Sequence, residues 1–300
     1  MTHQKPDIMI VGGYYHLRFL MTFVILKLFG VPFAFYSDTP QVHRKRSPLK
    51  RRIRALLLDW VFKNAKFILS TGQVGLDNFK SMGCPEAKLK NLPWAIDLEV
   101  PLQIDQETNN YASWIKRNYA PPETIIFACA GQLDPRKGYD VALKSFSQAV
   151  HQCPERPAVL LMAGDGPQRP ELEELAKSLG LAERIHFLGW LQPDRMKGLF
   201  KAADILVHPA QWDPYPVAVL EAMAWGLPVL ASDQTMAAVD RVRQGESGFI
   251  HPVDDVAVLA EHISYFLADP GRVRQMGAQA RKTAEQWPVS RCTRTIINLL

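Results

Sequence analysis

Short runs of apolar residues recur along this chain, and each is followed by a longer segment whose apolar residues have helical spacing. In the second half these runs lie at residues 125–130, 159–163, 185–188, 205–208 and 229–231. Strands that alternate with helices in this way form βαβ units, which build a parallel sheet covered by helices. The sequence therefore predicts an α/β fold with a complete doubly wound domain in this half, and such domains bind ligands at the carboxyl ends of their strands.

The first half shows the same alternation with fewer runs, at residues 8–11, 32–36 and 67–70. A polar segment after Asp97 interrupts the alternation and runs to the double proline at 121–122, although Tyr111, Trp114 and Tyr119 within it can form a short packed helix. A chain of 300 residues is longer than one hydrophobic core usually serves. We therefore expect two domains, residues 1–120 and residues 121–300.

The loop after the first strand of the second half combines glycine with basic residues, and it reads Gly131-Gln132-Leu133-Asp134-Pro135-Arg136-Lys137-Gly138. Glycines let a backbone approach a ligand closely, and the free amides at a helix start attract anions. Arg136 and Lys137 can neutralise the charge that develops on a departing diphosphate. The loop suits a diphosphate, but a plain turn with two solvated basic residues would have the same composition.

A second tight turn, Gly164-Asp165-Gly166-Pro167, directly follows the next strand. Such a sequence makes a stable turn without any ligand. Its position at the same edge of the sheet favours a role in binding.

The most informative stretch is residues 209–229, in which an acid in a loop precedes an acid on a helix. Asp213 and Glu221 are separated by seven residues, and Glu221 lies about one turn into a helix that begins near Val217. Carboxylates beside a cleft can hold the vicinal hydroxyls of a ribose or a sugar. The alternative is a surface acid on a small apolar helix, although an acid flanked by Ala222 and Met223 usually needs a partner.

Taken together, these segments resemble family 4 of the retaining glycosyltransferases with the GT-B fold. The match covers roughly residues 124–280: the loop 131–138 resembles the family's "GRL…KG" segment, 164–167 its "GDGP", 187–189 its "FLG", and the helix around Glu221 the second half of its E-x7-E region. Such enzymes have two Rossmann-like, doubly wound domains that face each other across a cleft. The resemblance implies a transferase that takes a hexose from a nucleotide-diphosphate sugar with retention of configuration.

Carried over residue by residue, the resemblance implies that Lys137 contacts the donor diphosphate, Glu221 the nucleotide ribose and Asp213 the donor sugar. Gly131, Gly138, Gly164, Asp165 and Gly166 complete the expected donor site. No metal ion and no other cofactor is required by this mechanism.

Two positions depart from the family pattern. Gln132 stands where the family usually has a diphosphate-binding Arg, so one positive charge is missing unless Arg136 supplies it. Asp213 replaces the usual Glu and is one methylene shorter.

Three further residues border this region. His208 ends a strand at the ligand edge, where it can pack, cap or contact a substrate. Trp212 can stack on a sugar or base, and we include it in the expected donor site, whereas Trp225 is expected to fill the core beside its helix.

The first half resembles the middle of the family's acceptor domain, so this domain is expected to be shortened. Gly12-Gly13 follows a strand and offers a substitute for the missing glycine-rich loop, although such turns are common. Asp38 is a third candidate catalytic residue, because it follows a strand where the family often places a residue facing the donor sugar, and His43 is a weaker one. Asp38 equally suits a turn or a helix cap.

Basic residues dominate between residues 43 and 66, where nine Lys and Arg side chains stand against the single acid Asp59. Within this segment Ile53, Leu56, Leu57, Trp60 and Val61 have helical spacing. Three interpretations stay open for the segment 44–66: its apolar face packs in the first domain, it rests on an anionic membrane, or it binds a phosphorylated acceptor. No nucleic-acid module surrounds it.

The sequence thus predicts a glycosyltransferase that modifies a glycan or lipid-linked acceptor, in the synthesis of a cell-surface polysaccharide or glycolipid. The main alternative is a catalytically weak or inactive protein that binds nucleotide sugars, as the shortened first domain together with Gln132 and Asp213 suggests. A nicotinamide-dependent oxidoreductase fits the alternation but lacks Gly-x-Gly-x-x-Gly after the first strand of either half.

The expected location is the cytoplasm, with peripheral contact at the inner face of the plasma membrane. No secretory signal precedes the first strand, and Cys84, Cys129, Cys153 and Cys292 have no paired spacing. The apolar stretch 19–35 contains Lys27, Gly30 and Pro32 and is not expected to span a membrane.

Overall fold

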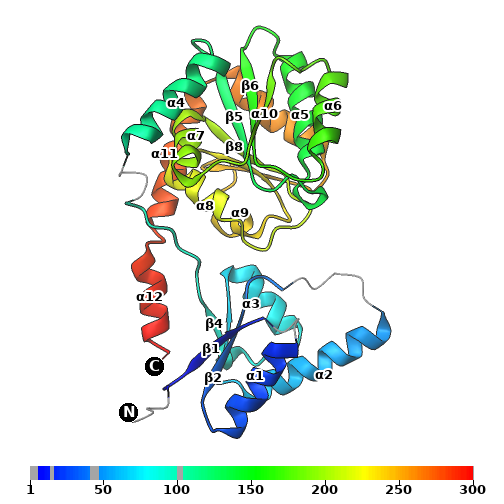
Figure 1. The fold of residues 1–300 in the computed structure, drawn as a ribbon, viewed down its shortest axis with the longest axis vertical. Coiled ribbons are helices and arrows are strands. Elements are labelled where there is room, and N and C mark those ends of the chain that lie inside the picture. Colours follow the sequence, from blue (N-terminus) through cyan, green and yellow to red (C-terminus); the bar gives the residue numbers. More distant parts are fainter. Residues whose placement is uncertain (1–5, 14–16, 41–46, 100–103, 300) are drawn as a thin grey trace. The chain divides into compact units, whose positions relative to one another are not determined.

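The computed structural model describes residues 6–13, 17–40, 47–99 and 104–299 (Figure 1). The chain forms two compact units. Unit 1 comprises the residues up to Ala95 together with those from Val289 onward, and unit 2 is Ile96–Pro288. His43 and the basic residues at 44–46 lie outside the described residues.

This division differs from the expected boundary at residue 120 for two physical reasons. Helix α4 (Gln106–Tyr119) belongs to unit 2 because it packs along α7 (Pro193–Ala202), and Thr108 Oγ1 donates a hydrogen bond to the Asp194 carbonyl at 3.4 Å. Helix α12 (Val289–Ile297) belongs to unit 1, where the buried Leu299 packs against Ala34 and Leu69. The polar composition of 106–119 therefore marks a surface helix of the second unit.

Unit 1 is built on a parallel sheet with strands in the order β1-β2-β3-β4. The three strands expected from the sequence are present within one residue at each end, and β4 was missed because it is short and none of its residues is buried. The elements are β1 (Met9–Gly12), α1 (Leu17–Leu28), β2 (Phe33–Ser37), α2 (Pro48–Asn64), β3 (Phe67–Ser70), α3 (Gly72–Ser81), a 3-10 turn (Glu86–Lys88) and β4 (Leu89–Asn91).

One face of this sheet carries the main core of unit 1. Phe33 and Phe35 of β2 pack there against Phe23 of α1, and Phe62 of α2 meets Phe79 of α3 edge to face at 6.0 Å between ring centroids. The apolar side chains on one face of this sheet therefore pack against the three helices α1, α2 and α3.

Unit 2 contains a six-stranded parallel sheet in the order β10-β9-β8-β5-β6-β7. The five strands expected in this half are confirmed, and β10 was missed because it has only four residues, two of them partly accessible. The remaining elements are β5 (Ile125–Ala130), a 3-10 turn (Pro135–Lys137), α5 (Tyr139–Gln152), β6 (Ala158–Ala163), α6 (Arg169–Ser178), β7 (Ile185–Gly189), β8 (Ile205–His208), α8 (Val217–Ala224), β9 (Val229–Ser232), α9 (Met236–Arg241), β10 (Gly248–His251), α10 (Val256–Ala268) and α11 (Gly271–Glu285).

The central strands β5 and β6 are buried on both faces, as continuous apolar strands between helices require. Helices α5, α6 and α10 lie on one side of the sheet in Figure 1, and α4, α7 and α11 on the other. The strand order reverses between β5 and β8, because the chain leaves β5 toward β7 and returns at β8 toward β10. This reversal is the point at which open α/β sheets form a ligand crevice.

No helix in the described ranges combines the length and the apolar character needed to cross a membrane.

Candidate functional site

Two glycine loops meet at the carboxyl ends of β5 and β6. The Gly131 N–H donates to the Ala163 carbonyl at 2.9 Å, and the two glycines have φ angles of +146° and +145° at Gly131 and Gly164. A Cβ on Gly164 would overlap the Gly131 carbonyl, and one on Gly166 would overlap the Leu133 carbonyl. The packing of the two loops against each other therefore already requires glycine at these positions, which the sequence assigned to donor binding.

Gly138 joins the β5 loop to the loop after β8. It precedes α5 with a left-handed φ of +62°, and a Cβ there would overlap the Pro209 carbonyl. The Gln211 N–H donates to the Arg136 carbonyl at 2.7 Å. Loops from both sides of the strand reversal are thus held together at the start of helix α5.

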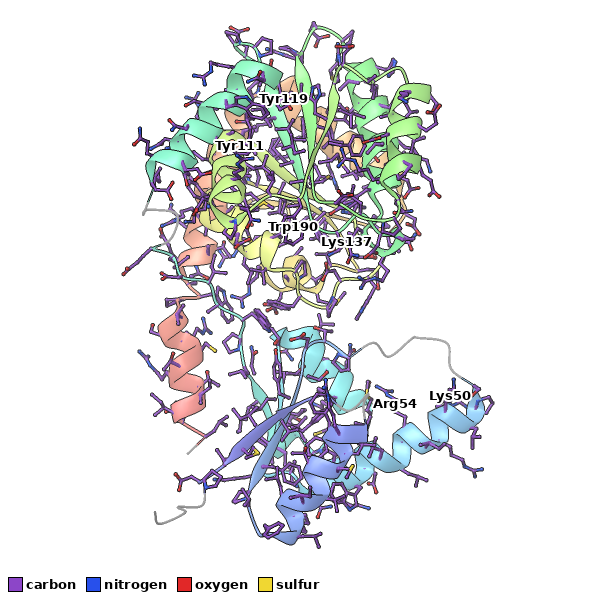
Figure 2. All side chains as sticks on the ribbon, in the orientation of Figure 1. Lys50, Arg54, Tyr111, Tyr119, Lys137 and Trp190 are labelled. Carbon is purple, nitrogen blue, oxygen red and sulfur yellow. The ribbon has the colours of Figure 1, made fainter. Side chains whose placement is uncertain are left out.

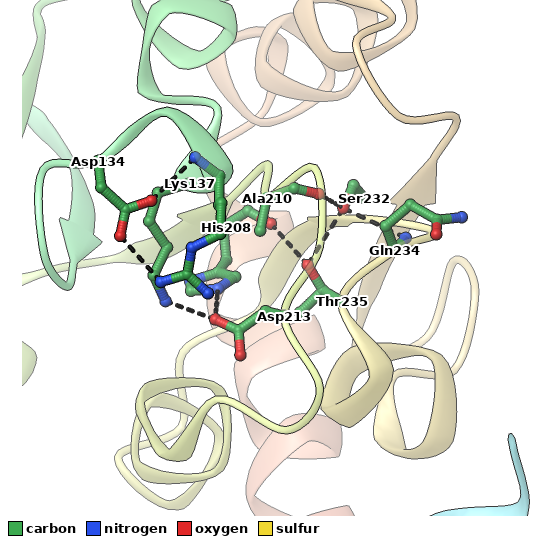
Figure 3. Close-up of polar contacts among 9 residues, drawn as sticks. Asp134, Lys137, His208, Ala210, Asp213, Ser232, Gln234 and Thr235 are labelled. Atoms are coloured by element: carbon green, nitrogen blue, oxygen red, sulfur yellow. Dashed lines mark hydrogen bonds and ion pairs between the residues drawn. The ribbon is translucent and has the colours of Figure 1, made fainter. Parts of the chain in front are cut away.

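Lys137, Asp213 and His208 form a polar cluster at this junction (Figure 3). Lys137 Nζ lies 2.5 Å from Asp213 Oδ2, and His208 Nε2 lies 3.0 Å from the same oxygen. The Lys137 and Asp213 side chains are only 16% and 10% exposed, and that of His208 is 1% exposed. The structure therefore brings together two residues that the sequence assigned to the donor site and one whose role was open.

Burial sets the protonation of the cluster. Burial lowers the pKa of His208 below its ordinary value, against the opposing effect of Asp213, so the ring is neutral and its Nε2–H donates to the carboxylate. Burial alone would raise the pKa of Asp213, but the His208 hydrogen bond and the Lys137 charge together lower it. Asp213 is thus an ionised carboxylate whose charge is balanced by Lys137.

The loop after β9 fixes the backbone of Asp213. The Asp213 N–H donates to the Gln234 carbonyl at 3.0 Å, and the Asp213 carbonyl accepts from the Met236 N–H at 3.0 Å. Ser232 Oγ donates to the Ala210 carbonyl, and Thr235 Oγ1 donates to the His208 carbonyl at 3.2 Å. Ser232 and Thr235 were missed by sequence reasoning, because small hydroxyl residues at the end of a strand and in the turn after it give no signal until the neighbouring loop is known.

Glu221 lines two adjoining cavities in unit 2. The smaller, of about 160 Å³, lies at the strand ends and is bounded by Gly131, Gly164 and Ala218. The larger, of about 570 Å³, extends toward Asp97 and Trp225. Both cavities are also lined by Trp190, Leu191, Met196 and Phe200.

Burial raises the pKa of Glu221, and within the described residues no side chain donates a hydrogen bond to its carboxylate. An acid on an apolar helix that lacks a protein partner has its hydrogen-bonding capacity available for a ligand. The cavity geometry favours the binding interpretation of Glu221 over that of a surface acid.

Trp190 is a cavity residue that the sequence did not single out. Its side chain is largely accessible, at 73% exposure for the residue, and it stands after β7 beside both cavities (Figure 2). Its position directly after the "FLG" segment is a signal that could have identified it. Trp225, expected in the core, is instead partly accessible and lines the larger cavity.

The other predicted donor residues lie around the same loops. Arg136 is exposed and paired with Asp134 at 2.9 Å, and Asp165 is exposed and lies 3.5 Å from Arg169. Gln132 is exposed, and Trp212 is half-buried. Neither Trp212 nor Gln132 is among the residues that line the two cavities.

Asp38 belongs to a separate polar group in unit 1. Its Oδ1 accepts hydrogen bonds from the Tyr36 hydroxyl and from Trp94 Nε1, the latter at 3.1 Å. Burial is the main cause that raises the pKa of Tyr36, and the Asp38 carboxylate adds to it. The role of Asp38 toward a donor sugar stays a prediction. In the described ranges, no cluster of three or more His, Cys, Asp or Glu side chains is arranged to hold a metal ion.

Residues 111–283 match the family model described as glycosyl transferases group 1. Among curated proteins, the chain is 32% identical over 184 residues to a D-inositol 3-phosphate glycosyltransferase of Rhodococcus jostii, covering 59% of this chain and 40% of that protein. It is 26% identical to a GDP-mannose-dependent alpha-(1-6)-phosphatidylinositol monomannoside mannosyltransferase of Mycolicibacterium smegmatis, covering 70% and 55%. The chain thus spans about two fifths to one half of the length of these two relatives.

Solved structures resemble nearly the whole chain. HepE of Anabaena in complex with UDP superposes with a TM-score of 0.82 at 19% identity, covering 97% of this chain and 78% of HepE. Sucrose-phosphate synthase of Thermosynechococcus elongatus gives a TM-score of 0.76 at 21% identity, covering 98% and 72%. These likenesses confirm the predicted GT-B-like class of two Rossmann-like units, whereas the expected shortening of the first one stays a prediction.

Proposed function

Because this chain belongs to the group 1 glycosyl transferases, we propose that unit 2 binds a nucleotide-diphosphate sugar and that the protein transfers the sugar to an acceptor. The observation that carries this proposal is the position of Glu221, which has no protein partner in the described ranges and lines the same cavity as Gly131 and Gly164. In this proposal Glu221 accepts hydrogen bonds from the ribose hydroxyls. The nucleotide then occupies the cavities beside Trp190.

Lys137 stands where it can meet the diphosphate. A Cβ on Gly131 would lie 3.7 Å from Lys137 Nζ, so the ammonium passes close to the glycine that borders the smaller cavity. Lysine has three N–H donors, and Asp213 occupies one of them. The remaining donors and the free amides at the start of α5 can stabilise the negative charge of the leaving diphosphate.

Asp213 is proposed to act on the donor sugar as an ionised carboxylate. Its Oδ2 is held by Lys137 and His208, and no donor side chain in the described residues contacts Oδ1. That second oxygen is available to a sugar hydroxyl. Glycosyl transfer passes through an oxocarbenium-like state, so stabilising the diphosphate contributes more than proton transfer.

The finer assignments rest on resemblance. We propose family 4 membership, transfer of a hexose with retention, and a glycan or lipid-linked acceptor, the last supported by the phosphatidylinositol monomannoside named for the Mycolicibacterium relative. Asp38 is proposed to face the donor sugar from unit 1. We place the activity on the cytoplasmic side of the membrane.

The second candidate function, a protein that binds nucleotide sugars without transferring them, is favoured by the charge of the β5 loop. Gln132 is neutral, and both cations of the loop are already paired, Arg136 with Asp134 and Lys137 with Asp213. A weakly neutralised leaving group would bind but depart slowly.

The test is calorimetric titration of nucleotide diphosphates and nucleotide sugars into the wild type, Glu221→Ala and the control Glu261→Ala, whose carboxylate is exposed on α10. Hydrogen bonds to a charged group contribute about 1.5–3 kcal/mol each, so Glu221→Ala is expected to weaken binding at least about tenfold. Release of free nucleotide diphosphate from the bound donor would establish turnover. Binding without turnover would favour the second candidate, and absence of binding to the folded wild type would refute the site.

A further inference from the structure

Helix α2 presents an apolar ridge to solvent along its first half. Leu49, Ile53 and Leu56 are 68%, 58% and 71% exposed. At about 100° per residue these positions fall on one narrow face of the helix. Burial begins only farther along the helix, where Leu58 and Phe62 enter the core of unit 1.

Basic side chains border this ridge. Lys50 and Arg52 flank it on either side, and both are exposed, as is Arg51. Arg54 is partly buried and its guanidinium lies 3.2 Å from Met82 Sδ. The first acidic residue of the helix is Asp59, which is paired with Lys63 at 2.7 Å. Figure 2 shows Lys50 at the end of α2 that projects away from the sheet of unit 1.

We propose that the first half of α2 docks in the interface of an anionic lipid membrane, with the ridge of Leu49, Ile53 and Leu56 inserted among the lipids. Helices that lie in a membrane interface combine an apolar face with flanking Lys and Arg, whose long stems reach back to the headgroups. Anionic headgroups attract the basic residues beside the ridge. Trp60 lies farther along the same face, but it is partly buried against the core of unit 1, so the ridge consists of the three exposed residues.

Other occupants fit this surface less well. Two copies of the chain that met through this ridge would bring Lys50, Arg51 and Arg52 of each copy against one another, and like charges repel. A soluble phosphorylated acceptor would neutralise the basic residues but would leave three large apolar side chains in water.

A second exposed apolar stripe lies on α1 and the residue after it, formed by Met21, Val24, Ile25, Leu28 and Phe29. Its basic residues are Arg18 and Lys27, fewer than those of α2. Because the positive charge that selects an anionic surface is concentrated on α2, we assign the membrane contact to α2. A variant of the α1 stripe is measured separately.

The test is sedimentation of the full chain with vesicles of phosphatidylcholine alone or of phosphatidylcholine with phosphatidylserine, without any sugar nucleotide. The charge variant is Lys50→Gln with Arg52→Gln, and the ridge variant is Ile53→Gln with Leu56→Gln. Matched controls are Lys177→Gln with Lys282→Gln, two exposed lysines of unit 2, and Val289→Gln with Ile297→Gln, two exposed apolar residues of α12. Circular dichroism verifies that each variant is folded.

The expected result is sedimentation of the wild type with the anionic vesicles only. A basic residue near an anionic surface contributes on the order of fivefold in affinity, so the charge variant should bind on the order of 25-fold more weakly. The ridge variant should lose at least about tenfold, because apolar burial supplies the insertion. Both control pairs should sediment like the wild type.

Three results would overturn the proposal. The first is absence of wild-type sedimentation with anionic vesicles. The second is unchanged sedimentation of both α2 variants together with loss of sedimentation in the double variant Leu28→Gln and Phe29→Gln. That result would assign the membrane contact to α1. The third is a concentration-dependent dimer that the ridge variant dissociates, without vesicle binding. Because the assay contains no donor, its failure would leave the proposed transferase activity untouched.

Discussion

The pair formed by Lys137 and Asp213 allows the most direct test of the site's electrostatics. Its atoms lie 2.5 Å apart and its side chains are 16% and 10% exposed. Removing one partner of a buried ion pair costs about 3–5 kcal/mol, because the other charge is left uncompensated. Asp213 keeps its hydrogen bond to His208 at 3.0 Å, so we expect Lys137→Met to lower the free energy of unfolding by about 2–4 kcal/mol.

The interaction free energy between Lys137 and Asp213 is measured by a double-mutant cycle that combines Lys137→Met with Asp213→Asn. The amide oxygen introduced by this substitution would still accept from His208, and the side chain would carry no charge, so the double variant is expected to be more stable than the two single effects predict. We expect a coupling of about 1–3 kcal/mol, measured by urea unfolding of the transition that belongs to unit 2.

The control is the exposed pair of Lys144 and Asp140 on α5, whose atoms lie 2.8 Å apart and whose side chains are 46% and 39% exposed. Its coupling should stay below about 1 kcal/mol, because water screens it. Additive effects at Lys137 and Asp213, within about 0.5 kcal/mol, would refute the argument that burial makes this pair strong.

Three further predictions concern the same region. Gly138→Ala should destabilise unit 2 by at least about 2 kcal/mol, because the left-handed φ and the overlap with the Pro209 carbonyl act together; a melting temperature equal to that of the wild type would contradict this. The pKa of His208 is lowered in the folded state, so its contribution to stability is present above its ordinary pKa of 6.5 and is lost as the pH falls. His208→Gln should therefore reduce the slope of the unfolding free energy against pH between about pH 5 and 7. An unchanged slope would exclude His208 as a source of this pH dependence. Glu221→Gln should raise the melting temperature while weakening nucleotide binding, because burial raises the pKa of this carboxylate and no partner in the described ranges is lost; parallel losses of stability and binding would indicate a structural role.

Much of the fold could be predicted from the sequence because its signals are local. The strands at 67–70, 125–130 and 205–208 were placed at their observed bounds, since each is an apolar run between turn residues. The short strands β4 and β10 were missed, because strands of three or four residues with partly accessible positions carry no apolar period. The compact units divide between Ala95 and Ile96 and not at residue 120, because polar composition does not distinguish a linker from a surface helix such as α4.

In the candidate site, too, some features could be predicted from local sequence and others could not. Gly131, Lys137 and Glu221 could be named as candidates from motifs, because each motif lies within one loop or one helix. The pairing of Lys137 with Asp213 joins residues 76 positions apart, and the hydroxyls of Ser232 and Thr235 act through a neighbouring loop. Trp190 and Trp225 were placed only by the cavities that they border.

The sequence by itself determined the α/β class, the positions of most strands along the chain and the glycines that the loops require, because backbone conformation and apolar period are properties of neighbouring residues. Only the tertiary structure decided which charges meet, which acid lacks a protein partner in the described ranges, and which apolar side chains of α2 face water. An apolar stripe has the same spacing whether it faces a core or the solvent, and a charge finds its partner only when distant loops converge at the strand ends.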